Sequence, residues 1–182
     1  MTVFIKNLIS KKRELKSANV LSGTTSTLDA QMMYVVCRLT KPDVVIGSGV
    51  RFGSFDAHIT AALNKNDNGV MYGIDLPNAI EKFDYGYLIP KSCEKRWEFR
   101  LGDAKDILPE LLEKVGPVDI FLHDSLHTRK HMKWEFEIAY PRIIKGGILA
   151  SHDVLLSNVF GNFANSKDMT WTRVRNQGVA QK

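Results

Sequence analysis

Two histidine–aspartate pairs stand where apolar, β-prone runs of the sequence end. These pairs are His123-Asp124 and His152-Asp153. If both runs are strands of one parallel sheet, their C-terminal ends open onto the same crevice, where open α/β sheets bind ligands. Carboxylate and imidazole groups there could hold a divalent ion, which would orient a substrate hydroxyl and lower its pKa. The alternative is that the aspartates cap the following helices and that the histidines are ordinary groups at the edge of the core.

A glycine turn earlier in the chain suits a cofactor. Gly47-x-Gly49 and Gly53 follow one apolar run and open a predicted helix. In that context glycines let a cofactor approach the backbone, and the amides at the start of the helix face it. The spacing alone is also compatible with an ordinary turn.

Two further aspartates follow predicted strands. Asp75 stands where a carboxylate can accept hydrogen bonds from both hydroxyls of an adenosine ribose, or can instead act as a helix cap or a turn residue. Asp103 could bond an adenine amine or cap the helix that begins at Ala104, and both roles are compatible with one residue.

The elements that must position these residues alternate along the chain. Apolar periodicity predicts helices between strands, which is typical of a doubly wound, mostly parallel α/β sheet flanked by helices. A long excursion after Asp75, to about residue 94, has the length of a lid. The predicted strands are 43–46, 70–75, 97–101, 118–122 and 147–151, and the helix before them carries Leu28, Met32, Val35, Val36 and Leu39 at helical spacing.

Length and composition limit the classes of protein. The 182 residues predict a single domain over 26–182, preceded by an N-terminal arm or weak helix over 1–25. No apolar run approaches the roughly 18 residues of a membrane span, and the N-terminus lacks a secretory layout, so we expect a cytoplasmic protein. The net charge of +5 comes without an aromatic-interleaved RNA motif, which makes nucleic acid an unlikely partner.

The ordered strand ends resemble the successive motifs of class I S-adenosylmethionine-dependent methyltransferases. The likeness is greatest to the small-molecule O-methyltransferase-like branch, methyltransferase family 24, and it covers about residues 26–154. The fold that it implies is Rossmann-like. The segments that carry it are Pro42 to Gly49, Tyr72 to Asp75, Gly102-Asp103-Ala104, Asp119 to His127 and Lys145 to Asp153.

This resemblance implies a role for each matching residue. The chain would methylate a hydroxyl of a small molecule or sugar, with His127 as general base beside Asp124, and with a divalent ion such as magnesium as a further cofactor. The implied cofactor-binding residues are Gly47, Ser48, Gly49, Gly53, Asp75, Asp103, Ala104 and His123, and the implied metal ligands are Asp124, His152 and Asp153.

The sequence departs from the family pattern at two places. Val45 occupies a position that is usually acidic and that anchors the cofactor's amino group. After Asp153 only one edge-like strand, at 169–174, is evident, so we expect a shortened C-terminal region whose sheet lacks a strand or is completed by a partner in a homo-oligomer.

Two other functions remain open on the sequence alone. The glycine turn followed by Asp75 also suits a nicotinamide-dependent oxidoreductase. A non-catalytic cofactor-binding or interaction domain of the same fold would account for Val45 and for the short C-terminal region.

Overall fold

The computed structural model describes residues 3–20, 26–77 and 83–182. The end of the predicted N-terminal arm, at 21–25, and part of the predicted excursion, at 78–82, lie outside these ranges. Every predicted site residue lies within them.

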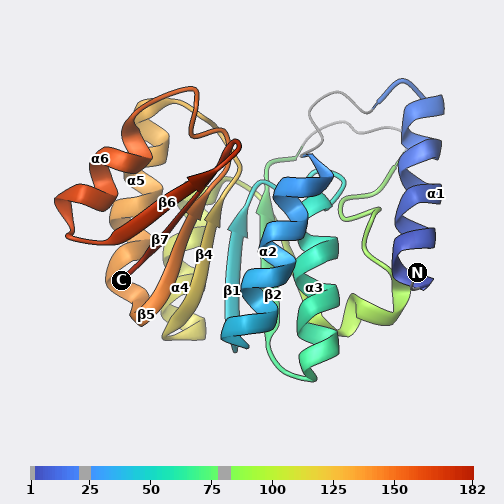
Figure 1. The fold of residues 1–182 in the computed structure, drawn as a ribbon, viewed down its shortest axis with the longest axis horizontal. Coiled ribbons are helices and arrows are strands. Elements are labelled where there is room, and N and C mark those ends of the chain that lie inside the picture. The colour runs from blue at the N-terminus through green and yellow to red at the C-terminus, as the bar shows by residue number, and fades with distance from the viewer. Residues whose placement is uncertain (1–2, 21–25, 78–82) are drawn as a thin grey trace.

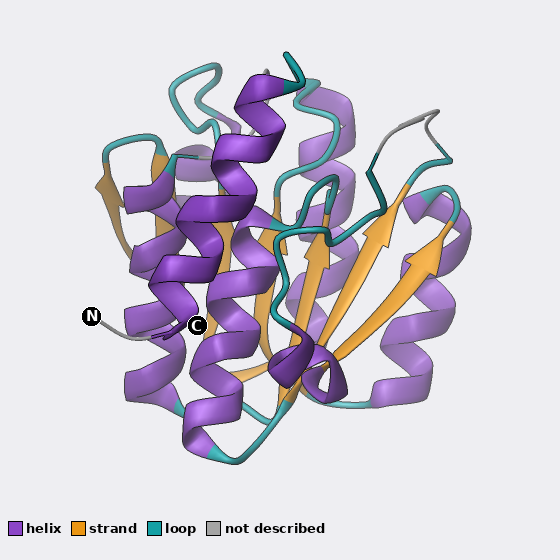
Figure 2. Ribbon diagram, turned by 90° about the vertical axis from the view of Figure 1, so that its right-hand side faces the viewer, coloured by secondary structure: helices purple, strands orange, loops and turns teal. Residues whose placement is uncertain are grey.

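One seven-stranded sheet forms the centre of the molecule, in the order β3-β2-β1-β4-β5-β7-β6. The first five strands in this order are parallel to one another, so their C-terminal ends meet at one edge (Figure 2). The predicted doubly wound, mostly parallel sheet is therefore confirmed. The strands are β1 (Val44–Ser48), β2 (Val70–Asp75), β3 (Trp97–Leu101), β4 (Val118–His123), β5 (Ile143–Ser151), β6 (Thr170–Val174) and β7 (Gln177–Gln181).

Helices cover both faces of this sheet (Figure 1). On one face, α2 (Thr27–Thr40) and α3 (Ser54–Asn66) pack on β1, β4 and β5. On the other face, α4 (Ala104–Val115), α5 (Arg129–Ala139) and α6 (Val159–Ser166) bury a larger apolar cluster around Phe121 and Phe136. Two 3-10 helices, Lys91–Arg96 and Tyr140–Arg142, precede β3 and β5. Within the described ranges, none of the helices has the length and apolar character that crossing a membrane requires.

The C-terminal region corrects one expectation. The sheet lacks no strand, because residues after Asp153 form α6 and then the antiparallel pair β6 and β7, of which β7 joins the edge of β5. The predicted edge strand at 169–174 is confirmed as β6. The missed strand, β7, is short and contains Gln177, Gly178 and Gln181, so it lacks the apolar run by which buried strands are recognised.

The helix predicted from the spacing of Leu28, Met32, Val35, Val36 and Leu39 is present as α2. Met32 and Val36 are partly buried, but Leu28, Val35 and Leu39 face outward. Their exposed fractions are 57%, 52% and 78%. The buried face instead carries the smaller set Ala30, Met33 and Cys37, which packs against α3 and β1. Since α2 has apolar residues on more than one side, periodicity alone does not identify the side that contacts the sheet.

The N-terminal helix α1 (Val3–Ser17) packs against the far end of the predicted excursion. Lys11 donates hydrogen bonds from Nζ to the carbonyls of Tyr87 and Ile89. Leu8 and Leu15 are buried in the same apolar cluster as Leu88 and Ile89. This part of the excursion is therefore held by α1 on its outer side.

The buried side chain of Phe121 should make a large contribution to the free energy of unfolding. Phe121 in β4 is fully buried, so Phe121→Ala should lower the free energy of unfolding by about 3 to 5 kcal/mol in urea denaturation. Leu39→Ala is the matched control and should change it by less than about 0.5 kcal/mol, because Leu39 is exposed. A large loss in the Leu39 variant would mean that the outer side of α2 is covered in solution.

Candidate functional site

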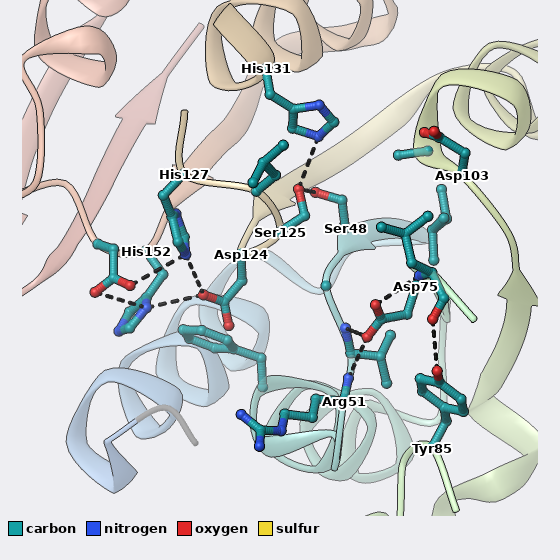
Figure 3. Close-up of a pocket in the computed structure, with 18 of the residues that line it drawn as sticks. Ser48, Arg51, Asp75, Tyr85, Asp103, Asp124, Ser125, His127, His131 and His152 are labelled. Atoms are coloured by element: carbon teal, nitrogen blue, oxygen red, sulfur yellow. Dashed lines mark hydrogen bonds and ion pairs between the residues drawn. The ribbon is translucent and has the colours of Figure 1, made fainter. Parts of the chain in front are cut away.

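The C-terminal ends of the five parallel strands border a cavity of about 810 Å³ (Figure 3). Loops after all five of these strands contribute to its wall. Most of the predicted site residues line it: Ser48, Gly49, Asp75, Asp103, Ala104, Asp124, His127, His152 and Asp153.

The glycine turn after β1 lies directly against the loop after β4. The amide of Asp124 donates to the carbonyl of Ser48 at 2.8 Å. Gly49 has φ of +88°, and a Cβ on it would lie 2.0 Å from the carbonyl oxygen of Asp124. Glycine is required here both by the backbone conformation and by the close approach of a second chain segment.

Asp75 secures the other side of this turn. Its Oδ2 accepts hydrogen bonds from the amides of Val50 and Arg51 at 2.9 and 2.7 Å, and its Oδ1 accepts one from the amide of Leu76. The carboxylate still borders the cavity. Asp75 therefore orders the turn and also presents oxygen atoms to a ligand.

Asp103 caps α4, as one of the two sequence interpretations predicted. Its Oδ1 accepts a hydrogen bond from the amide of Lys105 at 2.8 Å, and the residue also borders the cavity. The capping interpretation is thus confirmed, and a contact with a ligand stays compatible with it.

The two histidine–aspartate strand ends do converge, together with His127. His127 Nε2 lies 3.3 Å from Asp153 Oδ2 and 3.8 Å from Asp124 Oδ1. His152 Nδ1 lies 3.0 Å from the same Asp124 oxygen and 3.5 Å from Asp153 Oδ1. Figure 3 shows Asp124, His127 and His152 grouped at one side of the cavity, away from Asp75 and Asp103.

Burial and neighbouring charges shift the two imidazoles in opposite directions. Burial, with the nearby His123, lowers the pKa of His127 in spite of the two carboxylates beside it. For His152 burial acts in the same direction, but the hydrogen bond and charge of Asp124, together with Asp153 and Asp29, outweigh it and raise the pKa. His127 is therefore the imidazole that is more readily neutral.

Residues outside the predicted set complete this end of the site. Asp29, near the start of α2, lies 3.6 Å from His152 Nε2 and 3.6 Å from Arg175 Nε. Asn176, in the turn between β6 and β7, donates from Nδ2 to Asp153 Oδ1. No pattern in the C-terminal part of the sequence indicates that this turn reaches the strand ends.

The predicted metal ligands have suitable donor atoms but are not arranged around an ion. Within residues 3–20, 26–77 and 83–182, no group of three or more histidine, cysteine or acidic side chains has an arrangement that could hold a metal. Both ring nitrogens of His152 already face carboxylates: Nδ1 lies 3.0 Å from Asp124 Oδ1, and Nε2 lies 3.6 Å from Asp29 Oδ2. The metal, with Asp124, His152 and Asp153 as its ligands, stays a prediction.

Three predicted residues lie outside the cavity lining. Gly47 is inside β1, where a Cβ would meet the side chain of Met71 at 2.6 Å. Gly53 begins α3 and approaches Gly86 of the excursion. His123 is fully buried beneath the site and bonds to Glu135.

Val45 also points away from the cavity. Its side chain is fully buried in the apolar cluster formed with α2 and α3. An acidic residue at this position would therefore need a polar partner that the described cluster does not supply.

Residues 46–154 match a family model described as a methyltransferase domain, which covers more than half of the chain. The chain belongs to this methyltransferase family. The predicted family is therefore confirmed. The chain is also similar to two curated relatives from Streptomyces: demethylmacrocin O-methyltransferase of S. fradiae, 27% identical over 88 residues, and 8-demethyl-8-alpha-L-rhamnosyl tetracenomycin-C 2'-O-methyltransferase of S. olivaceus, 26% identical over 91 residues. The aligned parts cover 47% and 49% of this chain, but only 20% and 21% of those relatives.

Solved structures show that this methyltransferase shares its fold with O-methyltransferases. TomG of Streptomyces achromogenes, in complex with S-adenosylmethionine, has a TM-score of 0.74 at 14% identity over 96% of this chain and 88% of that one. An O-methyltransferase of Bacillus cereus, in complex with S-adenosylhomocysteine, has 0.73 at 15% identity over 97% and 91%. MycE, in complex with magnesium, S-adenosylhomocysteine and mycinamycin VI, has 0.60 at 15% identity over 84% and 47%.

The close approach at the glycine turn should make Gly49 of this methyltransferase intolerant of substitution. Gly49→Ala should lower the free energy of unfolding by more than about 3 kcal/mol in urea denaturation, because it adds a backbone collision to an unfavourable φ. Gly146→Ala is the matched control: Gly146 has φ of +82° with nothing within 4 Å of a Cβ, and should cost about 1 kcal/mol. Equal losses would show that only the backbone conformation matters at Gly49.

Proposed function

We propose that this chain binds S-adenosylmethionine in the cavity at the strand ends and transfers its methyl group to a hydroxyl of a small-molecule acceptor. The observation that carries the proposal is the division of one cavity into two ends. Asp75 and Asp103 border one end, and Asp124, His127, His152 and Asp153 border the other.

The cavity residues suit this cofactor. A volume of about 810 Å³ is within the range of ligand pockets, and the Asp75 carboxylate borders it with accepting capacity left for a ribose hydroxyl. Ser48 and Gly49 would lie beside the methionine part, and Asp103 with Ala104 beside the adenine. When bound, the cofactor supplies an electrophilic methyl group on its sulfonium sulfur.

His127 is the proposed general base. With its ring hydrogen on Nδ1, its Nε2 can accept the proton of the acceptor hydroxyl, and the carboxylates of Asp124 and Asp153 would stabilise the resulting imidazolium. The acceptor oxygen then bonds to the methyl carbon as the carbon–sulfur bond breaks, which leaves a neutral thioether. Asp124, His152 and Asp153 stay the proposed ligands of an optional divalent ion.

A methyl-acceptor molecule with an apolar surface fits the rim of the cavity beside His127. Leu126 borders the cavity next to His127, and Leu155 and Leu156 follow Asp153, and all three side chains are more than half exposed. The curated relatives are named as methyltransferases of demethylmacrocin and of a rhamnosylated tetracenomycin, which supports a small hydroxylated acceptor. Family membership favours methyl transfer over nicotinamide chemistry.

Calorimetric titration with S-adenosylmethionine or S-adenosylhomocysteine tests the cofactor. We expect binding, and we expect Asp75→Asn to weaken it about tenfold or more, because the amide cannot accept all the hydrogen bonds of the carboxylate. Asp67→Asn, a surface change at the end of α3, should bind like the parent chain. Absence of binding at millimolar ligand would contradict the proposed function.

Replacement of the proposed base separates chemistry from binding. His127→Ala should lower transfer of a labelled methyl group to a panel of hydroxylated small molecules by about a hundredfold or more, while S-adenosylhomocysteine still binds. Parallel reactions with EDTA and with added magnesium test whether transfer needs a metal. Full activity of the His127 variant would exclude it as the base.

A further inference from the structure

Glu135 is a fully buried carboxylate directly beneath the cavity wall. It projects from α5 on the helix side that also carries Met132, Phe136 and Ala139, all buried in the larger apolar cluster. A charged side chain among these neighbours costs free energy unless hydrogen bonds satisfy it. Its exposed fraction is 0%, so those bonds must come from the protein.

Four side chains supply these bonds, two to each carboxylate oxygen. Oε2 accepts from Ser48 Oγ and His123 Nδ1, both at 2.6 Å. Oε1 accepts from Ser125 Oγ at 2.9 Å and from His131 Nε2 at 2.8 Å. A carboxylate has about four lone-pair positions, so the accepting capacity of Glu135 is filled.

The carboxylate is held in its charged form. Burial alone would raise the pKa of Glu135, but hydrogen bonds from His123, His131 and Ser48 and the charge of His123 lower it to about 2. Charged acceptors form the stronger hydrogen bonds. The four donors are therefore bound to one fixed charge rather than to a neutral group.

The donors come from parts of the chain that are far apart in sequence. Ser48 is the last residue of β1, and His123 is the last residue of β4. Ser125 lies in the loop after β4, between Asp124 and His127, and His131 is one turn before Glu135 in α5. Ser48, Ser125 and His131 border the cavity, whereas Glu135 and His123 do not (Figure 3).

We propose that Glu135 is a positioning residue of the methyl-transfer site. Its carboxylate holds the loop that carries Asp124 and His127 against the end of β1. It also takes the hydroxyl hydrogens of Ser48 and Ser125, so that their oxygens face the cavity as acceptors. This inference rests on the proposed function, since the wall that Glu135 orders is the wall of the proposed cofactor cavity.

Titration calorimetry with S-adenosylhomocysteine tests this role, with stability measured separately. Glu135→Gln has the same shape without the charge. Its amide NH₂ would face hydrogen-bond donors from which it cannot accept a hydrogen bond. We expect it to remain folded and to bind the ligand about tenfold more weakly, the loss of about one charged hydrogen bond. Glu137→Gln is the matched control: Glu137 is an exposed carboxylate on the same helix whose Oε1 lies 3.6 Å from Lys133 Nζ, and the change should alter affinity less than about twofold.

Two further measurements keep the inference testable if Glu135→Gln does not fold. Ser125→Ala and Ser48→Ala each remove one donor, and each should weaken ligand binding about threefold or more. Ring N–H signals of His123 and His131 in ¹⁵N-histidine spectra should exchange slowly in the parent chain, because both rings donate to the buried carboxylate.

The outcomes are distinguishable. A folded Glu135→Gln variant with unchanged ligand affinity, or serine variants that both bind like the parent chain, would overturn the positioning role and leave Glu135 as a stabilising residue. Failure of the parent chain itself to bind S-adenosylhomocysteine would overturn the proposed function instead, whatever the histidine spectra show.

Discussion

The contact between the glycine turn after β1 and the loop after β4 is the constraint on which the site depends. Two backbone segments meet there without a side chain between them: Asp124 donates its amide hydrogen to Ser48, and its carbonyl oxygen occupies the space of a Cβ on Gly49. Any larger residue would separate β1 from the loop that carries the histidine–aspartate cluster. The distance between the proposed cofactor and acceptor ends of the cavity follows from this contact.

Two carboxylates stabilise this contact from opposite sides. Asp75 accepts hydrogen bonds from the amides of Val50 and Arg51 in the turn itself, and it also borders the cavity. Glu135 lies in the core and accepts hydrogen bonds from the hydroxyls of Ser48 and Ser125, which belong to the two segments that meet. Replacing a buried charge by a well-packed apolar side chain is often neutral or stabilising, so the proposed effect of Glu135 is to select one arrangement of its donors.

Much of the fold follows from local patterns. Strands such as β1, β2 and β4 are short, mostly apolar runs that end at Ser48, Asp75 and His123, and helical segments lie between them, so alternation and parallel order were predictable. The C-terminal hairpin was not predictable, because β7 has no apolar run by which a strand could be recognised. It forms a strand by pairing with β5. Likewise, the apolar spacing from Leu28 to Leu39 has the correct period for α2, but Leu28, Val35 and Leu39 lie on its exposed side.

For the site, the sequence by itself determined which residues stand at strand ends, because a parallel sheet brings those ends to one edge whatever the details of packing. That was enough to place Asp75, Asp103, Asp124, His127, His152 and Asp153 around one cavity. Only the tertiary structure decided that Glu135 meets Ser48 across 87 residues of chain, that Asp29 and Asn176 reach the histidine–aspartate cluster, and that Gly53 and His123 lie behind the wall. Such contacts depend on how a helix is rotated against the sheet and how a hairpin docks, and these are set by packing between distant segments rather than by the local order of residues.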